Sequence, residues 1–200
     1  MHHINRNTFL MKKILFPLLA IVLLFSCSSD DDSNGSQNAC DFDIPFMVEG
    51  NKWTMNATQF GFDAGQVENE LIGCGNSGME VLITTPNGNI SNNWKQEDGY
   101  LWTDANDAAD NDGYNRVYKI NAELGDVFTY TKNDGTVSTT EVIEIDAVIT
   151  VPAGTFVCDV YKKTSTSVIN ETLLMWNHEV GQIKTDSGFV IFELDSYDFN

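Results

Sequence analysis

The sequence predicts an all-β protein, a single antiparallel domain of roughly 10–12 strands that forms an open or half-closed barrel or a two-layer sandwich. Short runs of alternating apolar and polar residues, bounded by Gly, Asn and Asp, recur along the chain. Helical periodicity is nearly absent, so we expect neighbouring strands to be joined by short connections and to pair antiparallel. Because each strand has one apolar face, a sheet of this size must curl or fold back to bury it.

The charge and the composition exclude several classes of protein. The 200 residues contain 11 Lys+Arg against 29 Asp+Glu, a formal net charge of -18. Such a surface repels polyphosphates and anionic headgroups, so we expect no nucleic-acid partner and no electrostatic binding to a membrane surface. The hydrophobic fraction of 42% is too high for a disordered chain. Residues 40–200 contain no repeat, internal linker or shift in composition, which predicts one β domain there.

The first thirty residues have the layout of an export signal. A Lys-Lys pair precedes an apolar run, 14–25, that is shorter than the roughly 20 residues a membrane-spanning helix needs. The run ends in Leu-Phe-Ser-Cys at 24–27, which resembles the lipobox of bacterial lipoproteins. The resemblance implies diacylglycerol on the Cys27 thiol, cleavage between Ser26 and Cys27, and a further acyl chain such as palmitate on the new amino terminus. An ordinary signal peptide with a coincidental cysteine is the alternative.

We therefore assign residues 1–26 to a lipoprotein signal peptide, with Met11 as the expected start, and residues 27–39 to a flexible acidic tether. Several acyl chains on Cys27 would anchor the protein stably to a bilayer, because each buried methylene contributes about 0.8 kcal/mol. The expected location is the outer membrane of a Gram-negative type of cell envelope. The aspartates at 30–32 resemble a surface-export signal of some lipoproteins, and simple solvation of the tether explains them equally well.

Four stretches show the alternation of a strand most clearly. The first places Trp53, Met55 and Ala57 on one side. In 140–151 the odd-numbered residues from Ile143 to Val151 are expected to face the core. In 154–163 and 188–197 the even-numbered residues take that role, namely Phe156, Cys158, Val160, Val190, Phe192 and Leu194. Turn residues at 133–135 and 186–188 predict hairpins.

Three segments of the second half form an ordered set of motifs. They are Gly-Asp-Val-Phe-Thr-Tyr at 125–130, Val-Pro-Ala-Gly-Thr-Phe at 151–156, and Trp176 followed by Val-Gly-Gln-Ile-Lys at 180–184. The set resembles the TapB / DUF3108-like families of exported bacterial proteins. The resemblance implies an antiparallel β fold and export, with no particular activity. His178 and Glu179 depart from the pattern of those families, which tend to have Pro and Gly there.

The sequence contains no recognisable catalytic constellation. His178 is the one histidine after Cys27, and no Gly-x-Ser-x-Gly elbow accompanies it. Its place in an expected turn favours a solvated residue over a general base. A single histidine without a Cys-x-x-Cys pair also argues against zinc. We therefore expect no enzymatic activity, no catalytic residue and no cofactor.

A run of aspartates before Gly113 is the one metal-like cluster of the sequence: Asp104, Asp107, Asp110 and Asp112. Carboxylates in a Gly-containing loop are suited to Ca²⁺. The spacing does not match an EF-hand loop, because Ala108 and Lys119 would occupy its first and last ligand positions and neither is a suitable ligand. A looser calcium loop stays open, although a solvated loop on an acidic surface is the interpretation we favour.

Three cysteines remain after Cys27, and an exported protein meets an oxidising compartment. Cys158 shares a strand face with Phe156 and Val160, which suggests a small buried core residue. That leaves a disulfide between Cys40 and Cys74 as the pairing to consider, and spacing alone does not fix it.

Trp94, Tyr100 and Trp102 lie in an Asn-rich stretch, 87–102. Aromatic rings among amides can form a stacking surface for sugars or peptides, whereas aromatics of β proteins more often belong to the core. Both interpretations stay open.

The sequence leaves three hypotheses for function. The first is a lipid-anchored envelope protein that is not an enzyme and whose curved sheet binds an apolar ligand or a partner, by analogy with lipoprotein-carrier folds. The second is a structural or interaction module at the outer membrane with a filled core. A hydrolase ranks last, because a single histidine does not supply acid, base and nucleophile. A cavity of ligand size distinguishes the first two hypotheses. The sequence does not fix the oligomeric state.

Overall fold

The computed structural model describes residues 40–104, 114–131 and 135–200, which form one antiparallel sheet. Its twelve strands are β1 (Lys52–Gln59), β2 (Phe62–Gly75), β3 (Gly78–Thr85), β4 (Gly88–Glu97), β5 (Tyr100–Asp104), β6 (Tyr114–Lys119), β7 (Val127–Thr131), β8 (Val137–Val151), β9 (Gly154–Ser165), β10 (Val168–Asn177), β11 (Gly181–Asp186) and β12 (Val190–Asp198). The described ranges contain no helix, and the all-β prediction is confirmed.

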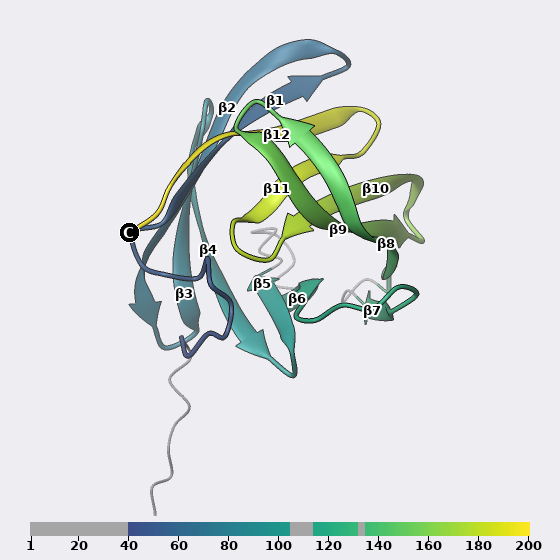
Figure 1. Ribbon diagram of the computed structural model, residues 1–200, viewed down its shortest axis with the longest axis horizontal. Coiled ribbons are helices and arrows are strands. Elements are labelled where there is room, and N and C mark those ends of the chain that lie inside the picture. The colour runs from purple at the N-terminus through teal and green to yellow at the C-terminus, as the bar shows by residue number, and fades with distance from the viewer. Residues whose placement is uncertain (1–39, 105–113, 132–134) are drawn as a thin grey trace, which may run out of the picture. The chain divides into compact units, whose positions relative to one another are not determined.

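The sheet consists of two meanders that meet at β1 and β12. The strand order is β6-β5-β4-β3-β2-β1-β12-β11-β10-β9-β8-β7. Every pair of adjacent strands except β1 and β12 is therefore also consecutive in the chain. Strands β2–β4 form one wall of the curved sheet and β8–β10 form the facing wall (Figure 1). The two expected hairpins, β7–β8 and β11–β12, are present. The sheet curls far enough to bury its inner face against itself, as a nearly closed barrel does.

The alternation predicted for β1 is confirmed, because Trp53, Met55 and Ala57 are all buried. The prediction for β8 is wrong at Ile143, which is 37% exposed, whereas its neighbour Val142 is fully buried. The pairing of β8 with β9 shifts register after Val142 and again before Ala147. Asp146 lies in this bulge with a φ of 59°, in the left-handed region. A bulge inserts residues into one strand, so the face that points inward changes along β8.

The segment that precedes β1 fills one end of the curved sheet with side chains. Ile44, Phe46 and Met47 are buried there. The Phe46 ring centroid lies 6.1 Å from that of Trp53 and 6.0 Å from that of Trp176. Aromatic rings at such separations contribute about 0.5–1.5 kcal/mol a pair beyond their burial. The segment therefore acts as a plug, which we define as residues 44–47.

A disulfide joins Cys40, just before the plug, to Cys74 of β2. Cys158 is a free, buried cysteine, and burial raises the pKa of its thiol to about 12. Such a thiol is inert at neutral pH.

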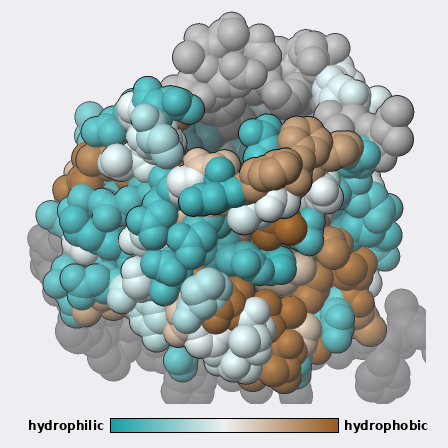
Figure 2. Space-filling model, turned by 90° about the horizontal axis from the view of Figure 1, so that it is seen from above, coloured by the Kyte–Doolittle hydropathy of each residue, from teal (hydrophilic) through white to brown (hydrophobic). Residues whose placement is uncertain are grey.

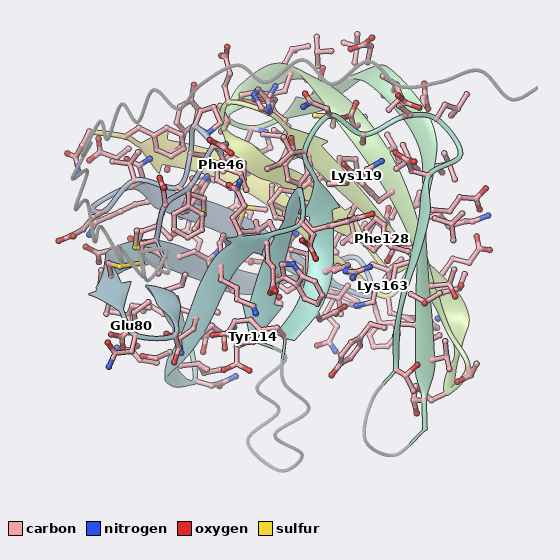
Figure 3. The ribbon with its side chains drawn as sticks, turned by 90° about the horizontal axis from the view of Figure 1, so that it is seen from below. Phe46, Glu80, Tyr114, Lys119, Phe128 and Lys163 are labelled. Atoms are coloured by element: carbon pink, nitrogen blue, oxygen red, sulfur yellow. A yellow bond between two sulfur atoms is a disulfide. The ribbon has the colours of Figure 1, made fainter. Side chains whose placement is uncertain are left out.

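The two ends of the sheet, β6 and β7, are not joined by a ladder of hydrogen bonds. Side chains close this seam instead: the ring of Tyr100 lies 5.2 Å from that of Phe128, and the Tyr161 hydroxyl donates to the Lys119 carbonyl at 3.3 Å. The Lys119 ammonium lies 2.5 Å from an Asp126 carboxylate oxygen. Figure 3 shows Lys119 and Phe128 on the same side of the domain.

No helix long and apolar enough to cross a membrane occurs among the residues that the structure describes.

Candidate functional site

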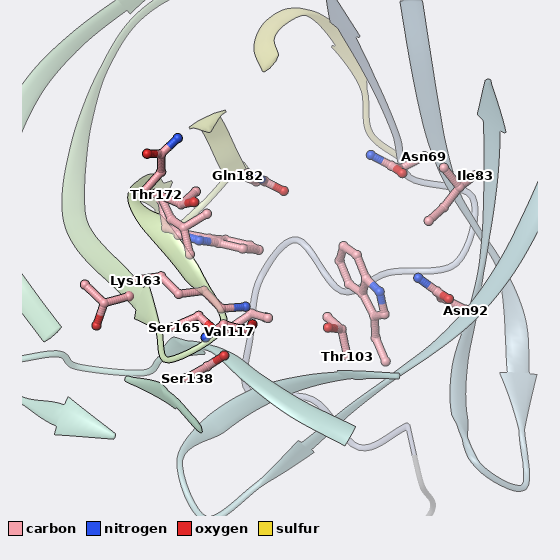
Figure 4. A pocket seen from close by; sticks show the side chains of 16 residues that line it. Asn69, Ile83, Asn92, Thr103, Val117, Ser138, Lys163, Ser165, Thr172 and Gln182 are labelled. Atoms are coloured by element: carbon pink, nitrogen blue, oxygen red, sulfur yellow. Dashed lines mark hydrogen bonds between the residues drawn. The ribbon is translucent and has the colours of Figure 1, made fainter. Parts of the chain in front are cut away.

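The inner face of the sheet is hollowed by a partly open cavity of about 540 Å³ (Figure 4). Strands from both walls line it, namely β2–β6 and β8–β11. Its volume lies within the roughly 300–1,000 Å³ of small-molecule sites. The core is thus not filled throughout.

Uncharged polar side chains make up most of the lining. Asn69 and Asn92 project from one wall, and Gln182 and Lys163 project toward the same space from the other (Figure 4). Hydroxyl groups, among them that of Ser138, complete the polar lining. Among the described lining residues Lys163 is the one charged side chain, and there is no carboxylate. In a chain with 29 Asp+Glu, this makes the cavity chemically unlike the rest of the surface.

Two tryptophans contribute aromatic rings to the cavity. Trp94 of β4 is 9% exposed and Trp176 of β10 is 3% exposed. Neither indole N–H has a hydrogen-bond partner within the described part of the chain. By contrast, the indole N–H of Trp53 donates to the Val180 carbonyl at 2.5 Å, and that of Trp102 donates to the Glu97 carbonyl at 3.0 Å. An unpaired buried donor is unfavourable, and buried polar groups are generally paired.

A smaller void lies behind these two rings and has about 10 Å³, close to the space that one water molecule needs. Asn69, Trp94, Trp176 and Gln182 line both spaces. The two spaces therefore share one polar and aromatic boundary.

The local sequence explains why a polar lining forms on the inner face. Asn92 stands two residues before Trp94, and Ser138 and Thr140 stand four and two residues before Val142. Because side chains alternate along a strand, each of these polar residues shares the inward face with a buried apolar one. We did not identify this cavity from the sequence. Polar residues in phase with a buried face are the signal that was available.

The three aromatic residues singled out in 87–102 are not brought together. Trp94 lies in the cavity, whereas Tyr100 and Trp102 flank the guanidinium of Arg116, whose carbon lies 4.7 Å and 4.5 Å from the two ring centroids. Lys95 also approaches the Trp102 ring, at 5.5 Å. These are cation–π contacts, and they occupy the rings of Tyr100 and Trp102.

His178 lies exposed in the turn after β10, as the sequence indicates. Its Nδ1 atom is 3.1 Å from the hydroxyl oxygen of Tyr118, whose pKa burial raises to about 12. A second groove, of about 520 Å³, contains His178 with Asp146, Asp159 and Glu179. Burial raises the pKa of Asp159. Within the ranges described, no three His, Cys, Asp or Glu side chains come together as metal ligands.

Several predicted site residues lie outside the described residues. They are Ser26 and Cys27 of the lipobox, and Asp107, Asp110 and Asp112 of the acidic cluster. Asp104 is described and ends β5. Lipidation and the calcium loop therefore stay predictions.

No family model and no curated protein matches the chain, so the likeness to the TapB / DUF3108-like families also stays a prediction. A solved structure from Bacteroides fragilis, of a protein inferred to be exported and having a YmcC-like fold, superposes with a TM-score of 0.54. The chains are 14% identical, and the match covers 80% of this chain and 100% of that one. The two share a fold. At this identity the likeness carries no function across.

Proposed function

We propose that this chain is an exported, lipid-anchored protein of the cell envelope whose β domain binds a small ligand and catalyses no reaction. The observation that carries the proposal is the cavity of about 540 Å³ on the inner face of the sheet. A filled core would have favoured the interaction module instead. The structural neighbour, inferred to be exported, supports the extracytoplasmic part of the proposal.

The lining supports binding rather than catalysis. Among its described residues there is no histidine and no carboxylate, so general acid–base chemistry would fall to Lys163 and hydroxyl groups. His178 and Asp159 belong to the other groove. Asparagine, glutamine, serine and threonine side chains hold a ligand by hydrogen bonds without reacting with it.

The lipid anchor is tested by labelling cells of a Gram-negative host with radioactive palmitate. We expect the full chain to incorporate label, and Cys27→Ser to lose it, because the thioether and the processed amino terminus both depend on that cysteine. Cys158→Ser is the matched control and should stay labelled, since Cys158 is buried in the domain. Equal labelling of the Cys27→Ser variant would contradict the anchor.

Ligand binding is tested by gentle purification of the full chain, native mass spectrometry and a parallel solvent extraction. The proposal predicts an additional mass of several hundred daltons, which is the size class that such cavities hold. A bare protein mass after incubation with an envelope extract would contradict it.

A second function has one specific observation in its favour. The aromatic rings of Phe60 and Phe189, at the tips of two hairpins, lie 5.5 Å apart and are exposed, and neighbouring Phe62 is 76% exposed. Figure 2 shows hydrophobic patches set in a mainly hydrophilic surface on the face seen from above. Exposed apolar patches often mark contacts with a partner, so an interaction module is the alternative.

A further inference from the structure

Amide and hydroxyl side chains make up most of the cavity lining among the described residues. Both kinds of group donate and accept hydrogen bonds. A carboxylate, which accepts alone when ionised, is missing from the described lining residues. A complementary ligand must therefore bring several uncharged oxygen groups that form hydrogen bonds.

Two tryptophan rings lie beside this polar lining. Trp94 and Trp176 are each at least nine-tenths buried, and both contribute to the wall of the cavity. Their Nε1 atoms are buried within the protein and have no acceptor in the described ranges. The two indoles therefore offer the ligand an aromatic surface.

The same lining argues against the purely apolar ligand that the sequence led us to expect. An acyl chain would bury the amides of Asn69 and Asn92 without offering them hydrogen-bond partners. A polar group that is buried and left unpaired disfavours such a complex. A ligand with many oxygens and some C–H faces satisfies the amides and packs on the tryptophan rings.

We propose that the ligand is a neutral saccharide whose ring packs against Trp94 and Trp176 while its oxygens form hydrogen bonds with the amide walls. This inference rests on the proposed function and names the ligand class of that same cavity.

The test uses the four tryptophan indole N–H signals of the ¹⁵N-labelled full chain. The probe is N,N′-diacetylchitobiose, which brings hydroxyl, ring and acetamido oxygens. We expect the Trp94 and Trp176 signals to shift in a saturable way, because the sugar ring changes the surroundings of both indoles. The signals of Trp53 and Trp102 serve as internal controls and should stay in place. Single Trp→Phe variants assign the four signals.

A pair of variants keeps the test independent of global folding. Asn92→Leu removes an amide of the cavity at nearly constant volume, and we expect at least tenfold weaker binding, the loss of one good hydrogen bond. Asn93→Leu changes the next residue, which the alternation places on the opposite face, and should bind as the unmodified chain does. Equal effects of the two variants would overturn the proposal.

A parallel titration with dodecanoic acid separates the two proposals. Shifts of the two cavity tryptophans with the fatty acid and none with the sugar would overturn the saccharide and keep a ligand-binding cavity. Shifts with neither probe, together with a bare mass by native mass spectrometry, would overturn both.

Discussion

Gly181 lies close to the plug, against the ring of Phe46. Its φ is +90°, and a Cβ atom built there would lie 3.3 Å from the ring of Phe46, which is fully buried. Glycine is thus required twice, by the backbone conformation and by the close approach of an aromatic ring.

We predict that Gly181→Ala lowers the free energy of unfolding by more than Gly188→Ala does. Gly188 also has a positive φ, +78°, and nothing lies within 4 Å of its Cβ position, so it isolates the backbone effect of roughly 1–2 kcal/mol. The additional loss at Gly181 reports the displacement of Phe46. Urea titrations of both variants measure the free energy of unfolding. Equal losses in the two variants would contradict the prediction, because they would show that displacing the Phe46 ring has no cost.

Asp126 shows how a single ion pair holds the seam. The hydrogen bond from the Lys119 ammonium, together with one from the Glu123 backbone N–H, lowers the pKa of the Asp126 carboxyl below its usual 3.8. A lowered pKa stabilises the folded chain above the unfolded value, and this contribution is lost as the pH falls through the folded value.

We predict that the difference in stability between the unmodified chain and Asp126→Asn is constant near pH 5–6 and shrinks as the pH falls below about 3.8. Urea midpoints between pH 2.5 and pH 6 measure this difference. Lys119→Met removes the cause of the shift and should abolish most of the pH dependence at this site. A difference that stays constant to pH 2.5 would contradict the role of the pair.

At the scale of the elements, local alternation was enough to predict the fold class but not every face. β1 follows its sequence pattern from end to end, because the register shifts of its two ladders insert a residue into β12 and into β2 and none into β1 itself. β8 does not, because its bulge depends on register against β9, which is a property of the pair of strands. Sequence patterns of one strand carry no information about the register of its partner.

The sequence did not predict the cavity, for a similar reason. The polar residues of its lining are far apart in the chain, and only closure of the sheet brings Asn69 of β2 opposite Gln182 of β11. Among the candidates from the sequence, Trp94 was the one that the fold placed there. Tyr100 and Trp102 were equally good candidates by composition, and they stack on Arg116 instead.

At the scale of the whole molecule, the charge and the cavity point to different partners. The net charge of -18 disfavours anionic partners at the surface, whereas the amide and hydroxyl lining of the cavity favours an uncharged ligand with oxygen groups. Plug and seam close the sheet with aromatic side chains and leave the polar part of its inner face accessible as the cavity. Trp176 takes part in both, because its ring packs against Phe46 of the plug and also lines the cavity.

The most direct test of the binding cavity is native mass spectrometry of two variants beside the unmodified chain, after incubation with an envelope extract. Thr172→Trp places a large side chain in the cavity, and Thr150→Trp places the same side chain on the exposed face of β8. Our account predicts bound mass on the unmodified chain and on Thr150→Trp, and none on Thr172→Trp, with all three proteins folded by circular dichroism. Equal bound mass on both variants would contradict the account, because the ligand would then lie outside the cavity.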